Sequence, residues 1–461
     1  MSLHIDTFAG KRVHMIGVGG SSMSGLCSLL HQRGYHLSGS DNYASYLTEQ
    51  VQSLGVSLTL SHQPENVHGA DLVIYSAAIS PENPERLEAT RLNIPQMERS
   101  TLLGQLMEGY QNAVGVSGTH GKTTTTAMLS QALIVAGLDP AVHIGGNFDF
   151  IGGSTRTGAK DVFVAEACEF HGSFLEMRPT VAVVLNIEED HLDYYRDLAH
   201  IREAFGRFVS LLPPTGIFLG NGDDANVRML MEAATCRSVT FGLRADNDWQ
   251  PLNLAYNEYG CGIFDAALHG KILAHVALRV GGEFNVLNAL SSLAAAHALD
   301  ADMEKAARAL SDFRGVHRRF EHTGTVSGVK LYHDYGHNPT EMRGALSVAK
   351  KQPHRRLFAV MQPHTYSRVK RLFSEYIHCC DAADEVLVTA IYAARESDPG
   401  DINSQMLVEE MQRAGVNVRL TSTFDDVEKY LREHWQPGDL VLTMGCGNIN
   451  ELNTQIEKHG D

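Results

Sequence analysis

Cysteine pairs and long apolar runs are missing from this sequence. Its seven cysteines, an odd number among 461 residues, include no Cys-x-x-Cys spacing, so neither a disulfide framework nor a structural zinc site is expected. No run reaches about 18 consecutive apolar residues, and the N-terminus lacks the uninterrupted apolar segment of a signal peptide. These absences argue against export and membrane spanning, and we expect the protein to reside in the cytoplasm.

Positive charge is also scarce. Lysine and arginine number 38 against 54 aspartates and glutamates, a net charge of -16. Such a balance disfavours nonspecific attraction to nucleic acid or to an anionic membrane, so neither is an expected partner. The hydrophobic content of 43% and the charged content of 20% are those of an ordinary globular protein. Nothing in the sequence indicates the oligomeric state.

Apolar, β-branched runs repeatedly precede longer helix-like stretches. Val13–Ile16 precedes Met23–Gln32, and Ala113–Val116 precedes Thr123–Ala136. Another such run is Val181–Leu185. This alternation predicts an α/β fold with parallel sheets.

The length predicts three domains, since domains usually hold about 100 to 200 residues. We place the first boundary near Tyr110, before a strand that starts a fresh βα unit. The second boundary falls in the arginine- and histidine-rich segment Phe313–Phe320, which follows the predicted helices Leu287–Leu299 and Met303–Leu310. The expected domains are residues 1–110, 111–314 and 315–461.

A first glycine-rich turn, Gly17–Gly25, lies between a predicted strand and a predicted helix. The N-H groups at such a helix start can hold a diphosphate. Asp41 lies 24 residues after Gly17, where a carboxylate can reach a ribose hydroxyl. Ser22 stands where the dinucleotide fingerprint has its third glycine, so both a tight structural turn and a dinucleotide site remain open.

A second glycine-rich turn, Gly118-Thr-His-Gly-Lys-Thr-Thr124, follows a strand and begins a helix. Backbone N-H groups of such a loop surround the phosphates of a nucleoside triphosphate. Lys122 can neutralise the β- and γ-phosphates, and the Thr123 hydroxyl can ligate magnesium. Val116 stands where the usual phosphate loop has its first glycine, so this is a variant of that loop.

Acidic and histidine residues follow two further predicted strands. Glu166 comes after Val162–Ala165, and Asn186 with Glu189-Asp-His-Leu-Asp193 comes after Val181–Leu185. The C-terminal ends of parallel strands are where α/β sheets place ligand groups. Oxygen-rich side chains with a nearby imidazole suit a hard cation such as Mg²⁺.

Together the segment GTHGKTTT, Glu166 and the segment NIEEDHLD resemble the Mur ligase family, and the resemblance runs from end to end of the chain. The members most similar in their motifs are those that add L-alanine. The motifs that carry this closer resemblance are GVGGSSMSG at Gly17–Gly25, SGSD at Ser38–Asp41, GVHRRFE at Gly315–Glu321, HDYGHNPTE at His333–Glu341, QPHTYSR at Gln362–Arg368 and IYAARE at Ile391–Glu396. The run Ala167–Gly172 departs from the acidic run common in the family.

The resemblance implies a Rossmann-like N-terminal domain for the UDP-sugar, a central ATPase domain and a Rossmann-like C-terminal domain for the amino acid. The residues it implies for ATP are Gly118, Thr119, His120, Gly121, Lys122, Thr123, Thr124, Asn285, Asn288, Arg319 and Asp334. Those implied for the UDP-sugar are Gly17, Gly19, Gly20, Ser22, Met23, Ser24, Asp41 and Ser76.

Magnesium would be held by Thr123, Glu166 and His191, and the amino acid would meet Tyr335, His337, Arg368 and Arg371. The residues implied in catalysis are Lys122, Glu166, His191, His337, Arg368 and Arg371. Because Arg319 and Asp334 belong to a different expected domain from Lys122, we expect the domains to close during the reaction.

The implied reaction is ATP-dependent amide-bond formation. The carboxylate of UDP-N-acetylmuramate would attack the γ-phosphate to give an acyl phosphate, and the amine of L-alanine would displace phosphate. Family members that add later residues resemble one another in a carbamoylated lysine of the central domain, whereas this sequence has no lysine between Lys160 and Lys271. That absence favours the alanine-adding members or the relative that recycles a murein tripeptide.

Two other classes of protein compete with this interpretation. An NAD-dependent oxidoreductase would use Gly17–Gly25 but would leave the Lys122 loop without a role. A noncatalytic nucleotide-binding regulatory module would use the Lys122 loop without turnover. Product analysis separates both from a ligase.

Overall fold

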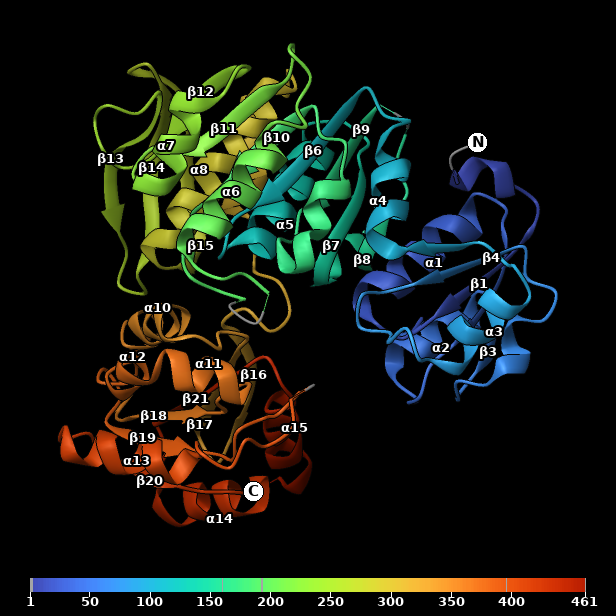
Figure 1. Cartoon of the computed structure of the whole chain (residues 1–461). Coiled ribbons are helices and arrows are strands. Elements are labelled where there is room, and N and C mark those ends of the chain that lie inside the picture. Colours follow the sequence, from blue (N-terminus) through green and yellow to red (C-terminus); the bar gives the residue numbers. More distant parts are fainter. Residues whose placement is uncertain (1–2, 160, 192–193, 395, 461) are drawn as a thin grey trace. The chain divides into compact units, whose positions relative to one another are not determined.

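Three predominantly parallel sheets form the protein, as the predicted α/β class requires (Figure 1). The computed structural model describes residues 3–159, 161–191, 194–394 and 396–460. Two units divide the chain. The first comprises Met1–Leu252, Asp265–Val276 and Leu287–Asp312, and the second comprises Asn253–Phe264, Ala277–Val286 and Phe313–Asp461. No helix in the described ranges is long and apolar enough to cross a bilayer.

The N-terminal sheet of the first unit has five parallel strands in the order β3-β2-β1-β4-β5. Its strands are β1 (Arg12–Ile16), β2 (His36–Ser40), β3 (Ser57–Thr59), β4 (Leu72–Tyr75) and β5 (Gln96–Glu98). Its helices are η1 (Ile5–Phe8), α1 (Ser21–Gln32), α2 (Tyr46–Ser53), η2 (Pro64–Val67), α3 (Pro84–Arg91) and α4 (Arg99–Met107). The strand order reverses between β1 and β4, so the crevice at their C-terminal ends is the expected ligand position.

The central sheet has the order β15-β14-β13-β12-β11-β10-β6-β9-β7-β8. Its strands are β6 (Asn112–Ser117), β7 (Ala141–Phe148), β8 (Gly153–Arg156), β9 (Val162–Glu166), β10 (Val181–Val184), β11 (Ile217–Asn221), β12 (Arg237–Phe241), β13 (Trp249–Tyr256), β14 (Cys261–Leu268) and β15 (Lys271–Gly281). The helices between and after them are α5 (Lys122–Val135), η3 (Asp149–Ile151), η4 (Phe170–Glu176), α6 (Leu198–Val209), α7 (Ala225–Ala233), α8 (Glu283–Ala298) and α9 (Met303–Ser311).

Strand β6 lies between β9 and β10, and all three run parallel. Each is an almost continuous run of buried apolar residues, which is typical of a parallel sheet covered on both faces. Because parallel strands end at the same edge, the segments that follow β9 and β10 flank the glycine-rich loop that follows β6. Glu166 is the last residue of β9, and Asn186 comes two residues after β10.

The second unit contains a six-stranded sheet in the order β16-β17-β21-β18-β19-β20, in which only the β16–β17 pair is antiparallel. Its strands are β16 (Glu321–Val326), β17 (Val329–Asp334), β18 (Leu357–Met361), β19 (Glu385–Val388), β20 (Val418–Leu420) and β21 (Leu440–Met444). Its helices are α10 (Pro339–Ala349), α11 (Tyr366–Arg371), α12 (Phe373–Ile377), α13 (Ser404–Arg413), α14 (Phe424–His434) and α15 (Asn450–His459).

Helix α4 ties the N-terminal sheet to the central one. Its residues Leu102, Leu103 and Leu106 belong to the same buried apolar cluster as Phe174 of η4. Gly104 allows this approach, because a Cβ there would lie well inside contact distance of the Glu176 carbonyl group. The first unit therefore has one continuous core beneath both sheets.

Substituting Gly104 by alanine should destabilise the first unit. The clashing atoms belong to the backbone of Glu176, which cannot rotate away as a side chain can, and overpacking of this kind costs about 1–3 kcal/mol. Thermal unfolding of Gly104→Ala should therefore begin at a lower temperature than that of the parent. Gly109→Ala is the matched control, because a Cβ at Gly109 meets no atom within 4 Å; equal unfolding of both variants would contradict the packing argument.

Candidate active site

The loop between β6 and α5 has the backbone conformation of a phosphate-binding loop. Gly118 has φ 143° and Gly121 has φ 86°. Residues with a Cβ adopt such positive φ values only with backbone strain. A Cβ on Gly118 would lie 2.9 Å from the Cβ of Leu185, and one on Gly121 would lie 2.7 Å from Oδ1 of Asn288. Gly121 also supplies no side-chain cap to α5, so the N-H groups at the helix start face the loop as an anion site.

The segment after β10 braces this loop. Asn186 Oδ1 accepts from the His120 N-H at 2.8 Å, and its Nδ2 donates to the His120 carbonyl at 3.1 Å. The Thr119 N-H donates to the Asn186 carbonyl at 3.1 Å, and the Glu188 N-H donates to Thr119 Oγ1 at 2.9 Å. These hydrogen bonds from Asn186 and Glu188 to Thr119 and His120 hold the loop in shape. The Asn186 amide contacts the loop backbone directly.

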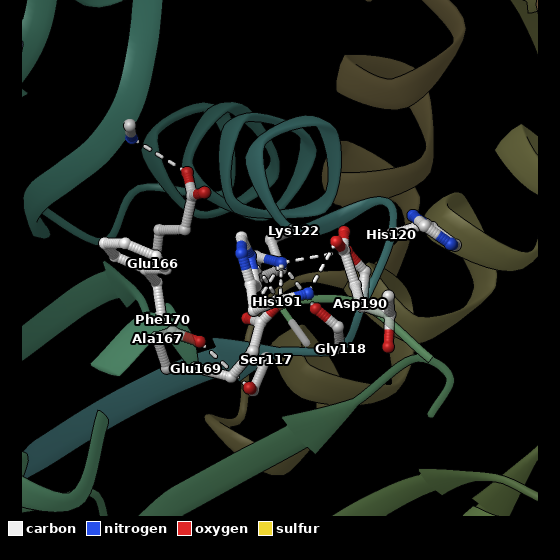
Figure 2. A network of polar contacts seen from close by, with 12 residues as sticks. Ser117, Gly118, His120, Lys122, Glu166, Ala167, Glu169, Phe170, Asp190 and His191 are labelled. Atoms are coloured by element: carbon white, nitrogen blue, oxygen red, sulfur yellow. Dashed lines mark hydrogen bonds and ion pairs between the residues drawn. The ribbon is translucent and has the colours of Figure 1, made fainter. Parts of the chain in front are cut away.

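Lys122 is the first residue of α5, and its ammonium group is surrounded by oxygen atoms (Figure 2). Nζ donates to the carbonyls of Gly118 at 2.6 Å and Thr119 at 2.9 Å, and to Glu169 Oε1 at 3.0 Å. The Lys122 side chain is 12% exposed and that of Glu169 is 3% exposed. Burial by itself would lower the pKa of Lys122, but the neighbouring negative groups, Glu169 and Glu166 among them, together outweigh that effect and raise the pKa above its ordinary value.

Thr123 and Glu166 lie together, as the predicted cation site requires. Thr123 Oγ1 donates to Glu166 Oε1 at 3.1 Å, and the Gly145 N-H donates to Glu166 Oε2 at 2.8 Å. A hydroxyl and a carboxylate beside a phosphate loop fit Mg²⁺, which is usually held by one or two protein groups plus phosphate oxygens and water. Within the described ranges, no group of three or more His, Cys, Asp or Glu is arranged to hold a metal without such a ligand.

His191, the third predicted metal ligand, contacts a different carboxylate. Its Nε2 lies 3.7 Å from Glu169 Oε1, and its ring lies 4.9 Å from that of Phe170. Its φ of 51° is in the left-handed region, an unusual conformation that is concentrated at functional sites. Asp193, at the end of the predicted acidic motif, lies outside the described residues.

The first glycine-rich turn lies between β1 and α1. The Gly17 N-H donates to the Ser40 carbonyl at 2.8 Å, and the Gly19 N-H donates to Asp41 Oδ2 at 2.9 Å. Gly17 has φ 75°, and Gly20 precedes α1 as its N-cap. Asp41 therefore supports the turn in this structure, and its Oδ2 is committed to the Gly19 N-H.

The side chains of residues 22–24, which follow this turn, pack against other parts of the protein. Met23 is 2% exposed and Ser24 is 5% exposed, so either would meet the UDP-sugar through its backbone. Ser22 Oγ lies 2.8 Å from Nε2 of His143 on β7 and accepts from Arg99 Nη1 at 3.0 Å. Ser76 follows β4, across the strand-order reversal from the turn, and is half-buried.

Burial keeps His143 neutral. Removal from water, together with the nearby Arg99 charge, lowers the pKa of His143 to about 3. A neutral imidazole can accept a hydrogen bond from the Ser22 hydroxyl at Nε2, with Thr155 Oγ1 at 3.4 Å from Nδ1. Ser22 and His143 thereby connect α1 of the N-terminal sheet to the edge of the central sheet.

This neutral histidine should make stability depend on pH. Its folded pKa of about 3 lies below the 6.5 of an unperturbed histidine, so its stabilising effect is complete above about pH 6.5 and is lost progressively as the pH falls toward 3. The loss approaches about 1.4 kcal/mol per pH unit. His143→Gln should reduce the fall in urea midpoint between about pH 7.5 and about pH 5. His36→Gln, at an exposed position on β2, should leave that fall as in the parent. Equal pH dependence of the urea midpoint in the parent and in both variants would refute the argument.

Two predicted residues on α8 are buried. Asn285 is 7% exposed and Asn288 is 5% exposed. The Asn285 Nδ2 donates to the Gly281 carbonyl at 2.8 Å, and the amide oxygen of Asn288 lies beside Gly121 of the phosphate loop. Thr124, in the first turn of α5, is half-buried.

In the second unit, Asp334 ends β17 and accepts two backbone hydrogen bonds. Its Oδ2 accepts from the Phe320 N-H at 2.8 Å, and its Oδ1 accepts from the Gly336 N-H at 2.6 Å. Burial raises the pKa of Asp334 above its ordinary value. The Arg319 guanidinium lies 4.7 Å from the centre of the Tyr335 ring, so Arg319, Asp334 and Tyr335 form one cluster.

His337 is fixed at the start of α10. Its N-H donates to Glu341 Oε2 at 3.0 Å, and its carbonyl accepts from the Tyr376 hydroxyl at 2.6 Å. Its ring lies 5.7 Å from that of Tyr335 and 5.8 Å from that of His364. Tyr335, His337 and His364 therefore form a row of rings at the C-terminal edge of the sheet.

The same row continues to α11. His364 Nδ1 lies 3.1 Å from Arg368 Nη1, and its ring stacks on Tyr392 with centroids 5.6 Å apart. Arg371, the last residue of α11, is exposed. The structure thus brings together Tyr335, His337 and Arg368 of the predicted amino-acid site.

Several residues of these clusters were not singled out from the sequence. They are Arg99, His143, Glu169, Arg318, Glu341, His364 and Tyr392. Glu169 lies three residues after Glu166 and had a detectable signal, namely an acidic residue within a segment that departs from the acidic run common in the family. Arg99 and His143 had none, because each meets Ser22 only through folding.

Comparison with known proteins decides the family. Three family models match: "Mur ligase family, catalytic domain" at residues 12–111, "Mur ligase middle domain" at 116–296 and "Mur ligase, glutamate ligase domain" at 318–447. The UDP-N-acetylmuramate--L-alanine ligase of Caldanaerobacter subterraneus is 44% identical over 98% of this chain and 99% of its own. The chain belongs to the Mur ligase family. It is accordingly an ATP-dependent ligase that forms amide bonds.

Solved structures of Mur ligases share the fold. The UDP-N-acetylmuramate-alanine ligase of Thermotoga maritima matches with a TM-score of 0.83 and 26% identity, over 97% of this chain and 99% of that one. A murein peptide ligase of Psychrobacter arcticus matches with a TM-score of 0.75 and 23% identity, over 97% and 98% of the two chains. The predicted fold class and family are both confirmed.

Proposed function

We propose that this Mur ligase joins L-alanine to the carboxylate of UDP-N-acetylmuramate, with ATP converted to ADP and phosphate, as a step of peptidoglycan precursor synthesis. The observation that carries the proposal is the 44% identity to a UDP-N-acetylmuramate--L-alanine ligase over 98% of the chain. The absence of any lysine between Lys160 and Lys271 agrees with it. The proposal implies a cytoplasmic location, where ATP is supplied.

We assign the substrates to three domains, residues 1–110, 111–314 and 315–461. The turn Gly17–Gly20 would hold the UDP diphosphate at the helix start of α1, with Arg99 close by as a cation. The Gly118–Thr124 loop would hold the ATP phosphates. Arg319 and Asp334 would complete the nucleotide site, with Asn285 and Asn288 for adenine.

A carboxylate is a poor acyl donor, because its charge repels nucleophiles and oxide is a bad leaving group. Transfer of the γ-phosphoryl group to it creates an acyl phosphate with a good leaving group. Lys122 would stabilise the charge that develops on the transferred phosphoryl group. Bound between Thr123 and Glu166, with His191 as a further ligand, Mg²⁺ would supply additional positive charge to the phosphate oxygens.

The second step is attack of the L-alanine amine on the acyl phosphate. The amine must lose a proton, and His337, whose backbone N-H and carbonyl are held by Glu341 and Tyr376, would assist that transfer. Arg368, held beside His364, and Arg371 would balance the negative charge of the tetrahedral intermediate and of the amino-acid carboxylate. Tyr335 would line the same pocket.

The deciding experiment is mass spectrometry of the products formed from ATP, UDP-N-acetylmuramate and a mixture of amino acids with the murein tripeptide. We expect UDP-N-acetylmuramoyl-L-alanine as the main product. A product carrying the tripeptide instead would assign the chain to the recycling ligases. Absence of any amide product with steady nucleotide binding would refute the proposed reaction.

A further inference from the structure

The Glu169 carboxylate is a buried anion that pairs with the phosphate-loop lysine (Figure 2). Its Oε1 accepts from Lys122 Nζ at 3.0 Å, and its Oε2 lies 2.9 Å from the same nitrogen. Both oxygens are therefore within ion-pair distance of one ammonium group. Because the two side chains are 3% and 12% exposed, solvent screens this pair far less than it screens a surface pair.

All three N-H groups of the Lys122 ammonium are engaged in this structure. Two of them donate to carbonyl oxygens of the loop itself, at Gly118 and Thr119, and the third donates to Glu169. An ammonium group has only three donors. Lys122 can therefore hold a nucleotide phosphate only if one of these hydrogen bonds is given up, and Glu169 is the partner whose charge a phosphate would replace.

The backbone of Glu169 is held in place, which limits how far its carboxylate can follow the lysine. The Tyr195 hydroxyl donates to the Glu169 carbonyl at 2.6 Å, and the Gly172 N-H donates to the same oxygen at 2.9 Å. The following residues His171 and Gly172 have φ of 52° and 68°, so the turn is a specific left-handed one. His191 Nε2 also lies 3.7 Å from Oε1.

One oxygen of the Glu169 carboxylate lacks a hydrogen-bond donor. Oε2 is buried and accepts no hydrogen bond from any residue in the described part of the chain, although it lies 2.9 Å from Nζ. A buried carboxylate oxygen without a hydrogen bond is costly. That cost is tolerated here only while the ammonium group stays close, so the pair resists separation.

We propose that Glu169 is a positioning residue that holds Lys122 when the loop is empty and competes with the nucleotide phosphates for it. This inference rests on the proposed assignment of the Gly118–Thr124 loop to the ATP phosphates. Binding of ATP breaks or stretches the Lys122–Glu169 pair, so part of the phosphate–lysine attraction is spent on separating the pair. When the nucleotide leaves, the pair re-forms, and Glu169 thereby promotes release of the product ADP.

The test compares three variants by calorimetric titration with Mg-ADP, which needs neither the UDP-sugar nor the amino acid. Glu169→Gln keeps the shape but removes the competing charge, and we expect ADP to bind about tenfold tighter, equivalent to about 1.4 kcal/mol. Glu169→Asp keeps the charge but draws it away from Nζ, so its affinity should lie between those of the parent and of Glu169→Gln. Glu176→Gln, an exposed glutamate at the end of η4, should bind ADP as the parent does.

A purely structural role for Glu169 would give the opposite result, since a loosened loop binds nucleotide more weakly. Unchanged or weaker ADP binding by folded Glu169→Gln overturns the proposal. If that variant does not fold, unchanged or weaker binding by Glu169→Asp overturns it in the same way. Failure to form the alanine product, with the affinity gain intact, would instead refute the proposed ligase reaction and leave the role of Glu169 standing.

Discussion

Replacement of Lys122 by alanine is expected to abolish alanine-dependent phosphate release, with a loss of about a thousandfold or more. Lys122 is the ammonium group at the start of α5, within 3.0 Å of two loop carbonyls and of Glu169. No neighbouring cation is placed by the described contacts to take over its position. Phosphate release with all three substrates measures the loss, and calorimetry measures UDP-N-acetylmuramate binding, which should remain nearly intact.

The variant needs a control for stability, because it strands the buried Glu169 carboxylate without its counterion. Such an unpaired charge costs about 3–5 kcal/mol. The double variant Lys122→Ala/Glu169→Gln removes that charge and should regain the thermal stability but not the activity. Lys271→Ala, at the exposed first residue of β15 in the same unit, should behave as the parent. Equal loss of phosphate release and of UDP-sugar binding in the double variant would contradict the separate assignment of the two glycine-rich turns.

Glu166→Gln should produce the second large effect, a fall in turnover of about a hundredfold or more, together with a requirement for higher Mg²⁺ concentration. Glutamine preserves the size of the side chain and can still accept one hydrogen bond, from either Thr123 or the Gly145 N-H. It removes the negative charge that a hard cation prefers in its ligands. Activity measured over a range of Mg²⁺ concentrations separates a lost ligand from a misfolded site.

Additional magnesium should partly restore the activity of Glu166→Gln but not that of Lys122→Ala, because only the Glu166→Gln substitution weakens cation binding. Glu176→Gln carries the same chemical change at an exposed position of the same unit and should leave the magnesium dependence as in the parent. A Glu166→Gln enzyme that needs no more Mg²⁺ than the parent would exclude Glu166 as a cation ligand.

The local elements of the site could be predicted because they depend on short stretches of chain. The strand expected at Ala113–Val116 is β6 (Asn112–Ser117), and the helix expected at Thr123–Ala136 is α5 (Lys122–Val135). The glycines at 118 and 121 have positive φ as a phosphate loop requires. Hydrophobic period, glycine spacing and helix-start chemistry are all read along the chain, so neighbouring residues suffice to predict them.

The partners of the site residues were harder to predict. The resemblance assigns Ser22 to the UDP-sugar site, which stays a prediction, but it could not indicate that the Ser22 hydroxyl contacts His143 and Arg99. His191 was expected beside Glu166, yet the carboxylate it contacts is that of Glu169. In both cases the partner lies on a different strand or helix, and no spacing along the sequence reports that neighbour.

The sequence by itself determined the chemistry: an α/β chain with two glycine-rich turns, a lysine and a threonine at a helix start, and the motifs of an amide-forming ligase. Only the tertiary structure decided which carboxylate faces which cation. The order β10-β6-β9 places Glu166 beside Thr123 and the Glu169 turn beside Lys122. The physical reason is that a parallel sheet gathers the ends of strands far apart in sequence at one edge, and strand order depends on packing of the whole domain rather than on any local pattern.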